Sequence, residues 1–173
     1  VDELTAMPLL IDYFNKKQIQ KPVVVATDIG ISKKARDFAL RMDAPLAIVE
    51  KRRIGNRDHV ESLSVIGDVN GREAILFDDE INTGGSMVAA SKMLSQLGVQ
   101  EIFAVATHGV LPGEALTMLD QTDDIKEFVI TDTVPFLLKK SSDKFKVISI
   151  APLFGEAIKR IHEGKSVGAL FGR

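Results

Sequence analysis

Hydrophobic runs and polar connections alternate along the whole chain. Residues 22–27 (PVVVAT) form a continuous apolar run, which predicts a strand buried on both faces, as in a parallel sheet. Residues 86–97 instead place apolar side chains at helical spacing, which predicts an amphipathic helix that ends at Gly98. The same patterns predict further helices over residues 2–14, 32–42, 113–119 and 152–161, and further strands over residues 46–49, 74–77, 102–107, 127–131 and 146–150. This alternation predicts an α/β fold with a doubly wound, mainly parallel sheet flanked by helices.

Polar clusters follow three of the predicted strands. They are Thr27–Asp28, Asp78–Asp79 and Thr107–His108. Ligands of doubly wound sheets bind beyond the carboxyl ends of the strands, so we expect these clusters to converge on one site. Residues 51–61 are polar and basic without an apolar period, and they are predicted to form a loop.

Residues 78–86 (DDEINTGGS) carry the most specific chemistry. Two acids end an apolar strand, and a Gly-Gly pair then precedes a predicted helix. Glycines let the backbone approach a ligand closely, and the N–H groups at a helix N-terminus favour phosphate. The carboxylates can accept hydrogen bonds from sugar hydroxyls. The segment therefore predicts a sugar-phosphate site, although an acidic turn followed by a helix cap fits the same residues.

Composition restricts the class of protein. A hydrophobic content of 45% with 27% charged residues is typical of one globular domain, here 173 residues long. A net charge of −2 argues against a nucleic-acid surface, and the lack of cysteine excludes disulfides and cysteine nucleophiles. No apolar stretch approaches the roughly 18 residues that a membrane span needs. We therefore expect a cytoplasmic protein without membrane contact.

Together with residues 78–86, several other segments resemble the ribose-phosphate diphosphokinase (phosphoribosyl-pyrophosphate synthetase) family. They are residues 1–8 (VDELTAMP), 24–28 (VVATD), 50–53 (EKRR), 107–113 (THGVLPG) and 156–163 (EAIKRIHE). The resemblance covers essentially all 173 residues. It implies a type I phosphoribosyltransferase fold. It also implies that residues 1–173 are a single domain forming the carboxyl-terminal half of a longer two-domain enzyme, and that this half is inactive alone.

The resemblance also implies roles for individual residues. The ribose 5-phosphate ligands would be Asp78, Asp79, Asn82, Thr83, Gly84, Gly85 and Ser86. The pyrophosphate loop would comprise Asp28, Ile29, Gly30 and Ile31, with Asp28 next to Mg²⁺. The catalytic residues would be Lys51 and Arg53, on a loop that closes over the triphosphate of ATP.

The implied reaction transfers the diphosphoryl group of ATP to ribose 5-phosphate. Its products are AMP and 5-phosphoribosyl 1-diphosphate, a precursor for nucleotide biosynthesis. Mg²⁺ is the implied cofactor, and the family forms homo-oligomers built from dimers, often hexamers.

Two alternative functions and several alternative residue roles stay open at this stage. Asn82 stands where the family has a third acid, and Ile31 where it has a second glycine, so the chain also fits a non-catalytic regulatory paralogue. A phosphoribosyltransferase would use the same phosphate loop. Among single residues, Asp28 also fits a helix cap, residues 51–53 fit a solvated basic patch, and His108 fits a packed histidine.

Overall fold

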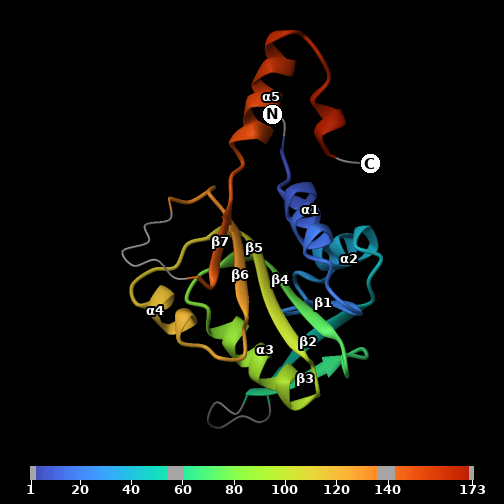
Figure 1. The fold of residues 1–173 in the computed structure, drawn as a ribbon, viewed down its shortest axis with the longest axis vertical. Coiled ribbons are helices and arrows are strands. Elements are labelled where there is room, and N and C mark those ends of the chain that lie inside the picture. The colour runs from blue at the N-terminus through green and yellow to red at the C-terminus, as the bar shows by residue number, and fades with distance from the viewer. Residues whose placement is uncertain (1–2, 54–60, 136–142, 172–173) are drawn as a thin grey trace.

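The computed structural model describes residues 3–53, 61–135 and 143–171. Within these ranges the chain forms a seven-stranded sheet in the order β3-β2-β1-β4-β5-β6-β7 (Figure 1). The strands are β1 (Pro22–Ala26), β2 (Leu46–Arg53), β3 (Glu61–Ile66), β4 (Glu73–Ile81), β5 (Glu101–Gly109), β6 (Glu127–Thr131) and β7 (Phe145–Ile148). Among the strands of these described ranges, only β2 and β3 pair antiparallel, and every other neighbouring pair is parallel. The expected doubly wound, mainly parallel sheet is confirmed.

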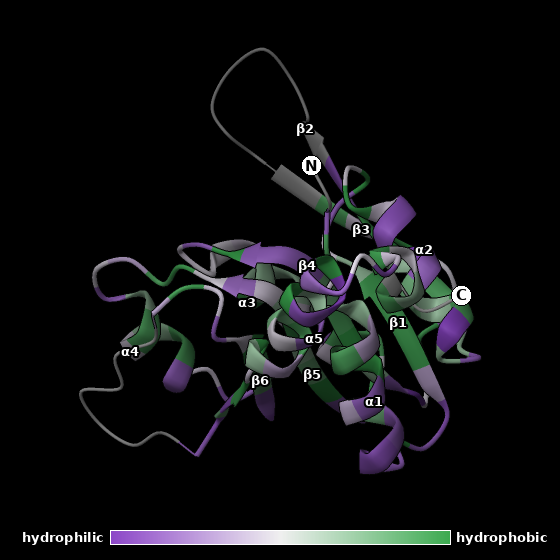
Figure 2. Ribbon diagram, turned by 90° about the horizontal axis from the view of Figure 1, so that it is seen from above, coloured by the Kyte–Doolittle hydropathy of each residue, from purple (hydrophilic) through white to green (hydrophobic). Residues whose placement is uncertain are grey.

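Helices cover both faces of this sheet. They are α1 (Met7–Lys17), α2 (Ser32–Arg41), α3 (Gly85–Gln96), α4 (Ala115–Asp120), α5 (Ala151–His162) and the 3-10 helix η1 (Val167–Phe171). Helices α1 and α2 pack on one face through Phe14 and Phe38, and α3 and α4 pack on the other through Leu94 and Leu119. Because β1, β4 and β5 are covered on both faces, their apolar runs are continuous, and hydrophobic residues line β1 and β5 in the middle of the molecule (Figure 2).

Several expected boundaries were wrong, two of them near the N-terminus and at the edge of the sheet. The first helix begins at Met7 rather than at residue 2, because Pro8 occupies its first turn and Thr5 accepts a hydrogen bond from the Met7 N–H at 3.2 Å. The stretch 51–61 is not all loop, since β2 continues to Arg53 and a further strand, β3, begins at Glu61. These two strands form an antiparallel ribbon at the edge of the sheet.

Helix α5 projects from the body of the molecule together with η1 (Figure 1). Ala157 is its buried residue, whereas Phe154, Ile158 and Ile161 are exposed. In the described part of the chain, no helix has both the length and the apolar character that crossing a bilayer requires.

The aromatic cluster under α1 gives a test of this packing. Phe14 is 1% exposed and makes edge contacts with Tyr13, Phe38 and Phe103. We expect Phe14→Ala to lower the free energy of unfolding by about 3–5 kcal/mol, because the surrounding rings cannot fill the cavity. Phe154→Ala on the exposed face of α5 is the matched control and should change it by no more than about 0.5 kcal/mol. Urea unfolding followed by circular dichroism measures both, and equal losses would contradict the assigned core.

Candidate sugar-phosphate site

The three polar clusters meet at one edge of the sheet, as expected. Strands β1, β4 and β5 are adjacent and parallel, so their carboxyl ends lie side by side. The buried Thr27 hydroxyl donates to Asp78 Oδ2 at 2.5 Å, and this bond joins the ends of β1 and β4. Both acids lie within β4, which runs on to Ile81 instead of ending at Phe77.

A hollow of about 110 Å³ opens between the end of β4 and the start of α3. It is lined by Asp78, Glu80, Ile81, Asn82, Thr83, Gly84, Gly85, Ser86 and Met87. The first N–H groups of a helix have no partners within it, so they are free to donate to an anion. The hollow therefore combines a carboxylate that can accept from hydroxyls with a helix N-terminus that can bind phosphate.

Gly84 fixes the shape of this loop. Its φ of 80° lies in the left-handed region, and its carbonyl accepts the hydrogen bond from the Val88 N–H that opens α3. A Cβ at Gly84 would meet Leu119 Cδ2 at 2.5 Å, and Leu119 is fully buried in α4. The loop thus rests directly on the hydrophobic core.

Lys51 reaches this loop from β2. Its Nζ donates to Ser86 Oγ at 2.9 Å, which places an ammonium group at the N-terminus of α3. Lys51 lies in a strand and not in the loop that the sequence suggested. Arg53 ends the same strand, and its side chain lies outside the described part of the chain.

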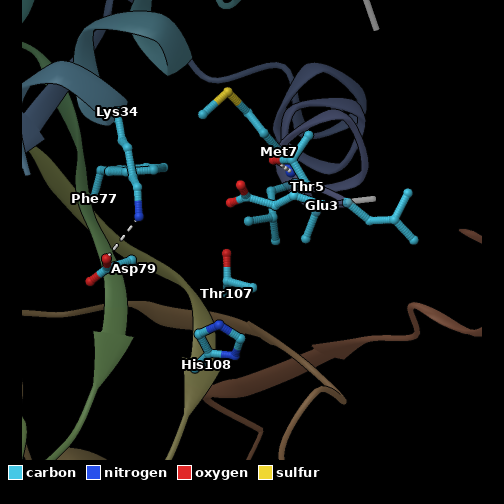
Figure 3. Close-up of a pocket in the computed structure, with 11 residues that line it drawn as sticks. Glu3, Thr5, Met7, Lys34, Phe77, Asp79, Thr107 and His108 are labelled. Carbon is cyan, nitrogen blue, oxygen red and sulfur yellow. Dashed lines mark hydrogen bonds and ion pairs between the residues drawn. The ribbon is translucent and has the colours of Figure 1, made fainter. Parts of the chain in front are cut away.

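Asp78 and Asp79 point to opposite faces of the sheet, because side chains alternate along a strand. Asp78 faces the hollow at α3. Asp79 faces α2, where its Oδ2 accepts from Lys34 Nζ at 3.0 Å (Figure 3). Asp79 and Lys34 line a second cavity of about 180 Å³, together with Thr107 and His108 on β5. The sequence predicted one shared role for the two acids, whereas the structure gives each its own surroundings.

The two acids also differ in their electrostatics. Burial raises the pKa of Asp78 above its usual value, although the Thr27 hydroxyl and the Asp79 N–H both donate to its carboxylate. The hydrogen bond from the Lys34 ammonium lowers the pKa of Asp79. The adjacent carboxylates therefore do not compete equally for a proton.

The segment 28–31 lies between β1 and α2. Asp28 Oδ1 accepts from the Ile31 N–H at 3.1 Å, so this carboxylate orders the loop as a local cap does. Ile29 and Gly30 are exposed, whereas the Ile31 side chain is buried in the core under α1 and α2. The Ile31 side chain therefore anchors the loop in the core. The backbone of its neighbours Ile29 and Gly30 lies on the side of the loop that faces solvent.

A family model agrees with this geometry. The phosphoribosyl synthetase-associated domain matches residues 55–172, more than half of the chain. The chain belongs to this phosphoribosyl synthetase family. The ribose-phosphate pyrophosphokinase of Caldanaerobacter subterraneus subsp. tengcongensis is 50% identical over 172 residues, which are 99% of this chain and 54% of that protein. The chain thus spans about half the length of such relatives.

Solved structures support the same assignment. The phosphoribosylpyrophosphate synthetase of Mycobacterium smegmatis superposes with a TM-score of 0.83 at 34% identity, over 92% of this chain and 51% of that one. An adenine phosphoribosyl transferase from Trypanosoma brucei shares the fold, with a TM-score of 0.51 at 16% identity, over 83% of this chain and 64% of that one. The expected resemblance to the synthetase family is confirmed.

Sequence reasoning missed Lys34 as a member of this edge. The residue lies in the first turn of α2, six positions after Asp28, and nothing in a charged helical turn indicates which strand it faces. The polar end of β5 was noticed. The sequence did not predict that this end of β5 lines a cavity together with Glu3 and Thr5 from the segment before α1.

Gly84→Ala tests the loop between β4 and α3 of this synthetase-family domain. The substitution forces a left-handed φ on alanine and drives Cβ into Leu119, so we expect a loss of about 2–4 kcal/mol of unfolding free energy. Gly85→Ala is the control, because its nearest contact would be Thr83 Oγ1 at 3.9 Å and its φ is not positive. If both variants unfold at the same urea concentration, the described loop conformation is wrong.

The opposite pKa shifts predict opposite pH dependence for two amide variants. Asp78 has a raised pKa in the folded state, so its ionisation costs stability as pH rises above 3.8. Relative to the natural protein, Asp78→Asn should therefore become more stable as pH rises from acid to neutral. Asp79 has a lowered pKa, so its ionisation adds stability, and this stability is lost as pH falls through the folded-state pKa. Relative to the natural protein, Asp79→Asn should therefore become less stable as pH rises from acid to neutral. Urea midpoints across this pH range measure both trends, and a shared sign would contradict the split.

Proposed function

We propose that this chain is the ribose 5-phosphate-binding domain of a ribose-phosphate diphosphokinase. The observation that carries the proposal is the hollow at α3, where Asp78, the helix N-terminus and Lys51 lie together. A phosphate bound by the N–H groups of residues 84–86 would lie beside the Lys51 ammonium. The ribose hydroxyls would then face Asp78, which Thr27 already holds in place.

The diphosphoryl donor would bind at the neighbouring loop 28–31. Helix α2 begins directly after it, so N–H groups and the helix dipole face the same edge of the sheet. Mg²⁺ commonly binds through one or two carboxylates together with substrate phosphates. Asp28 fits such a role with its remaining oxygen. In the described ranges no cluster of three acidic or histidine ligands forms a separate metal site.

In the parent reaction, the 1-hydroxyl oxygen of ribose 5-phosphate attacks the β-phosphorus of ATP. The bond between the β-phosphorus and the oxygen bridging to the α-phosphorus breaks, AMP leaves, and the hydroxyl proton is released. Phosphoryl transfer depends on positioning and on compensation of negative charge. Here Lys51 would supply charge at the transferred group and Asp78 would orient the sugar. Arg53, on the same strand, is proposed to assist Lys51.

The remaining features of the enzyme belong to the same proposal. The identity to ribose-phosphate pyrophosphokinases supports ATP and ribose 5-phosphate as substrates of a parent about twice this length. It favours the synthetase over a phosphoribosyltransferase. We further propose that residues 1–173 are one domain of that parent and form its carboxyl-terminal half, that the parent is a cytoplasmic homo-oligomer, and that this domain alone does not turn over.

Ribose 5-phosphate should bind the 173-residue chain, whereas unphosphorylated ribose should not. We expect Ser86→Ala to weaken binding about tenfold, because it removes one hydrogen bond to a charged group. Ser95→Ala is the control, since this hydroxyl lies on the same helix and bonds Asp124 instead. Isothermal titration calorimetry measures the affinities. Equal binding of ribose, or no binding at all, would refute the proposed site.

Transfer itself is tested in a chimera. The matching segment of the Caldanaerobacter protein is replaced by this chain, and ³¹P NMR follows ATP and ribose 5-phosphate with Mg²⁺. We expect AMP and phosphoribosyl diphosphate to form. A chimera that becomes active only with Asn82→Asp would indicate a regulatory paralogue. If both chimeras are silent while ribose 5-phosphate still binds, the transfer activity is refuted.

A further inference from the structure

Thr27 lies where the two parts of the proposed site meet. It follows β1 directly, and its side chain is only 1% exposed. The pair Ala26 and Phe77 ends the register between β1 and β4. The next residues, Thr27 and Asp78, therefore lie opposite each other, and their side chains leave neighbouring parallel strands on the same face. The Thr27 hydroxyl accordingly reaches Asp78 Oδ2 and donates to it at 2.5 Å.

Each carboxylate oxygen of Asp78 has one donor in a fixed position. Oδ2 accepts from the Thr27 hydroxyl, and Oδ1 accepts from the Asp79 N–H at 2.8 Å. A carboxylate oxygen can accept two hydrogen bonds, so each oxygen keeps one acceptor position. The two donors fix the rotation of the carboxylate and with it the directions of the remaining positions. Asp78 lines the hollow at α3, where a sugar hydroxyl would take such a position.

The two donors differ in where they come from. The Asp79 N–H belongs to β4 itself, whereas the Thr27 hydroxyl comes from the neighbouring strand. Thr27 also precedes Asp28, whose Oδ1 accepts from the Ile31 N–H and orders the loop 28–31. The Thr27 hydroxyl therefore ties an acid of the proposed sugar site to the strand that carries the proposed diphosphate loop.

We propose that Thr27 is a positioning residue that determines sugar recognition, because its hydroxyl sets the orientation in which Asp78 receives a sugar hydroxyl. The inference rests on the proposed function and leaves the role of Asp79 unchanged. Among the described residues that line the hollow at α3, Thr27 is absent, so it acts on the ligand through Asp78. Its contribution should concern the sugar and not the phosphate.

A purely structural role gives a different expectation. A buried hydroxyl that bonds across two strands contributes to folding wherever it lies. Thr131 is the matched case, since it is fully buried at the end of β6 and donates to the Thr107 carbonyl at 2.7 Å. Thr131→Val removes a comparable hydrogen bond that does not involve a carboxylate of the site.

The test uses two ligands that share a phosphate. Ribose 5-phosphate carries sugar hydroxyls and methyl phosphate carries none, so the ratio of their affinities measures sugar recognition. The proteins are the natural chain, Thr27→Val, Thr27→Ala, Thr27→Ser and Thr131→Val. Serine and alanine at position 27 differ by the hydroxyl alone, so they decide the question even if the valine variant does not fold. Calorimetry measures ribose 5-phosphate, and NMR shift titration measures methyl phosphate.

We expect Thr27→Val and Thr27→Ala to bind ribose 5-phosphate about tenfold more weakly, because a charged acceptor loses a fixed donor. Their affinity for methyl phosphate should not change. Thr27→Ser should keep the natural affinity for both ligands. Thr131→Val should do so as well, although its urea midpoint falls as that of Thr27→Val does.

A double-mutant cycle tests the route through Asp78. In an Asp78→Ala background, Thr27→Val should change ribose 5-phosphate affinity by less than about twofold, because no carboxylate is left to orient. A further tenfold loss in this background would overturn the proposal, since Thr27 would then act independently of Asp78.

The outcomes separate the two proposals. If the natural chain binds neither ligand, the proposed function fails, and this role of Thr27 fails with it. If the natural chain prefers ribose 5-phosphate and Thr27→Ala binds it equally well, only the role of Thr27 is overturned. A parallel loss of methyl phosphate binding, or an equal loss in Thr131→Val, would also overturn it, because the effect would then be structural.

Discussion

The site depends on a carboxylate that is partly buried at the end of a central parallel strand. Burial penalises the charge of Asp78, so the protein must compensate it with donors that are fixed in place. Thr27 supplies one from the end of β1, and the Asp79 backbone supplies another. The Asp79 donor is local, whereas the Thr27 donor lies within reach because β1 and β4 run parallel and end at the same edge. The sheet topology is therefore what makes an acid at this depth tolerable.

The sequence was sufficient for the fold and for the convergence of the strand ends. Continuous apolar runs such as residues 22–27 identify buried parallel strands with little ambiguity. Strand β3 was missed, although ESLSVI partly alternates polar and apolar residues, because the run is short and adjoins the polar, basic stretch that predicted a loop. Its partner, the end of β2, is basic and resembles a solvated loop. Edge strands with one solvent-exposed face carry a weaker sequence signal than central strands. Whether such a segment forms a strand depends on its pairing with a neighbouring strand.

The same limit applies to the site. Residues 78–86 predicted the glycine turn before α3 because glycines and a helix start are local features. The separation of Asp78 from Asp79 was not predicted, since it requires β4 to continue through both acids. An acidic pair is usually assigned to a turn, where neighbouring side chains can share a ligand. Once the strand extends to Ile81, alternation sends the two carboxylates to different faces, and the partner of Asp79 then comes from a helix 45 residues earlier in the chain.

The contact between Gly84 and Leu119 restricts how such a domain can diverge. The floor of the hollow at α3 is shared with the hydrophobic core, so a change at this glycine alters folding before it alters binding. The exposed positions of the loop, which include Asn82 and Ser86, do not pack against the core and are not restricted in this way. A lineage that abandoned catalysis could replace those side chains one at a time and still keep a well-formed anion pocket. Within this architecture, the capacity to hold a phosphate should outlast the capacity to transfer one.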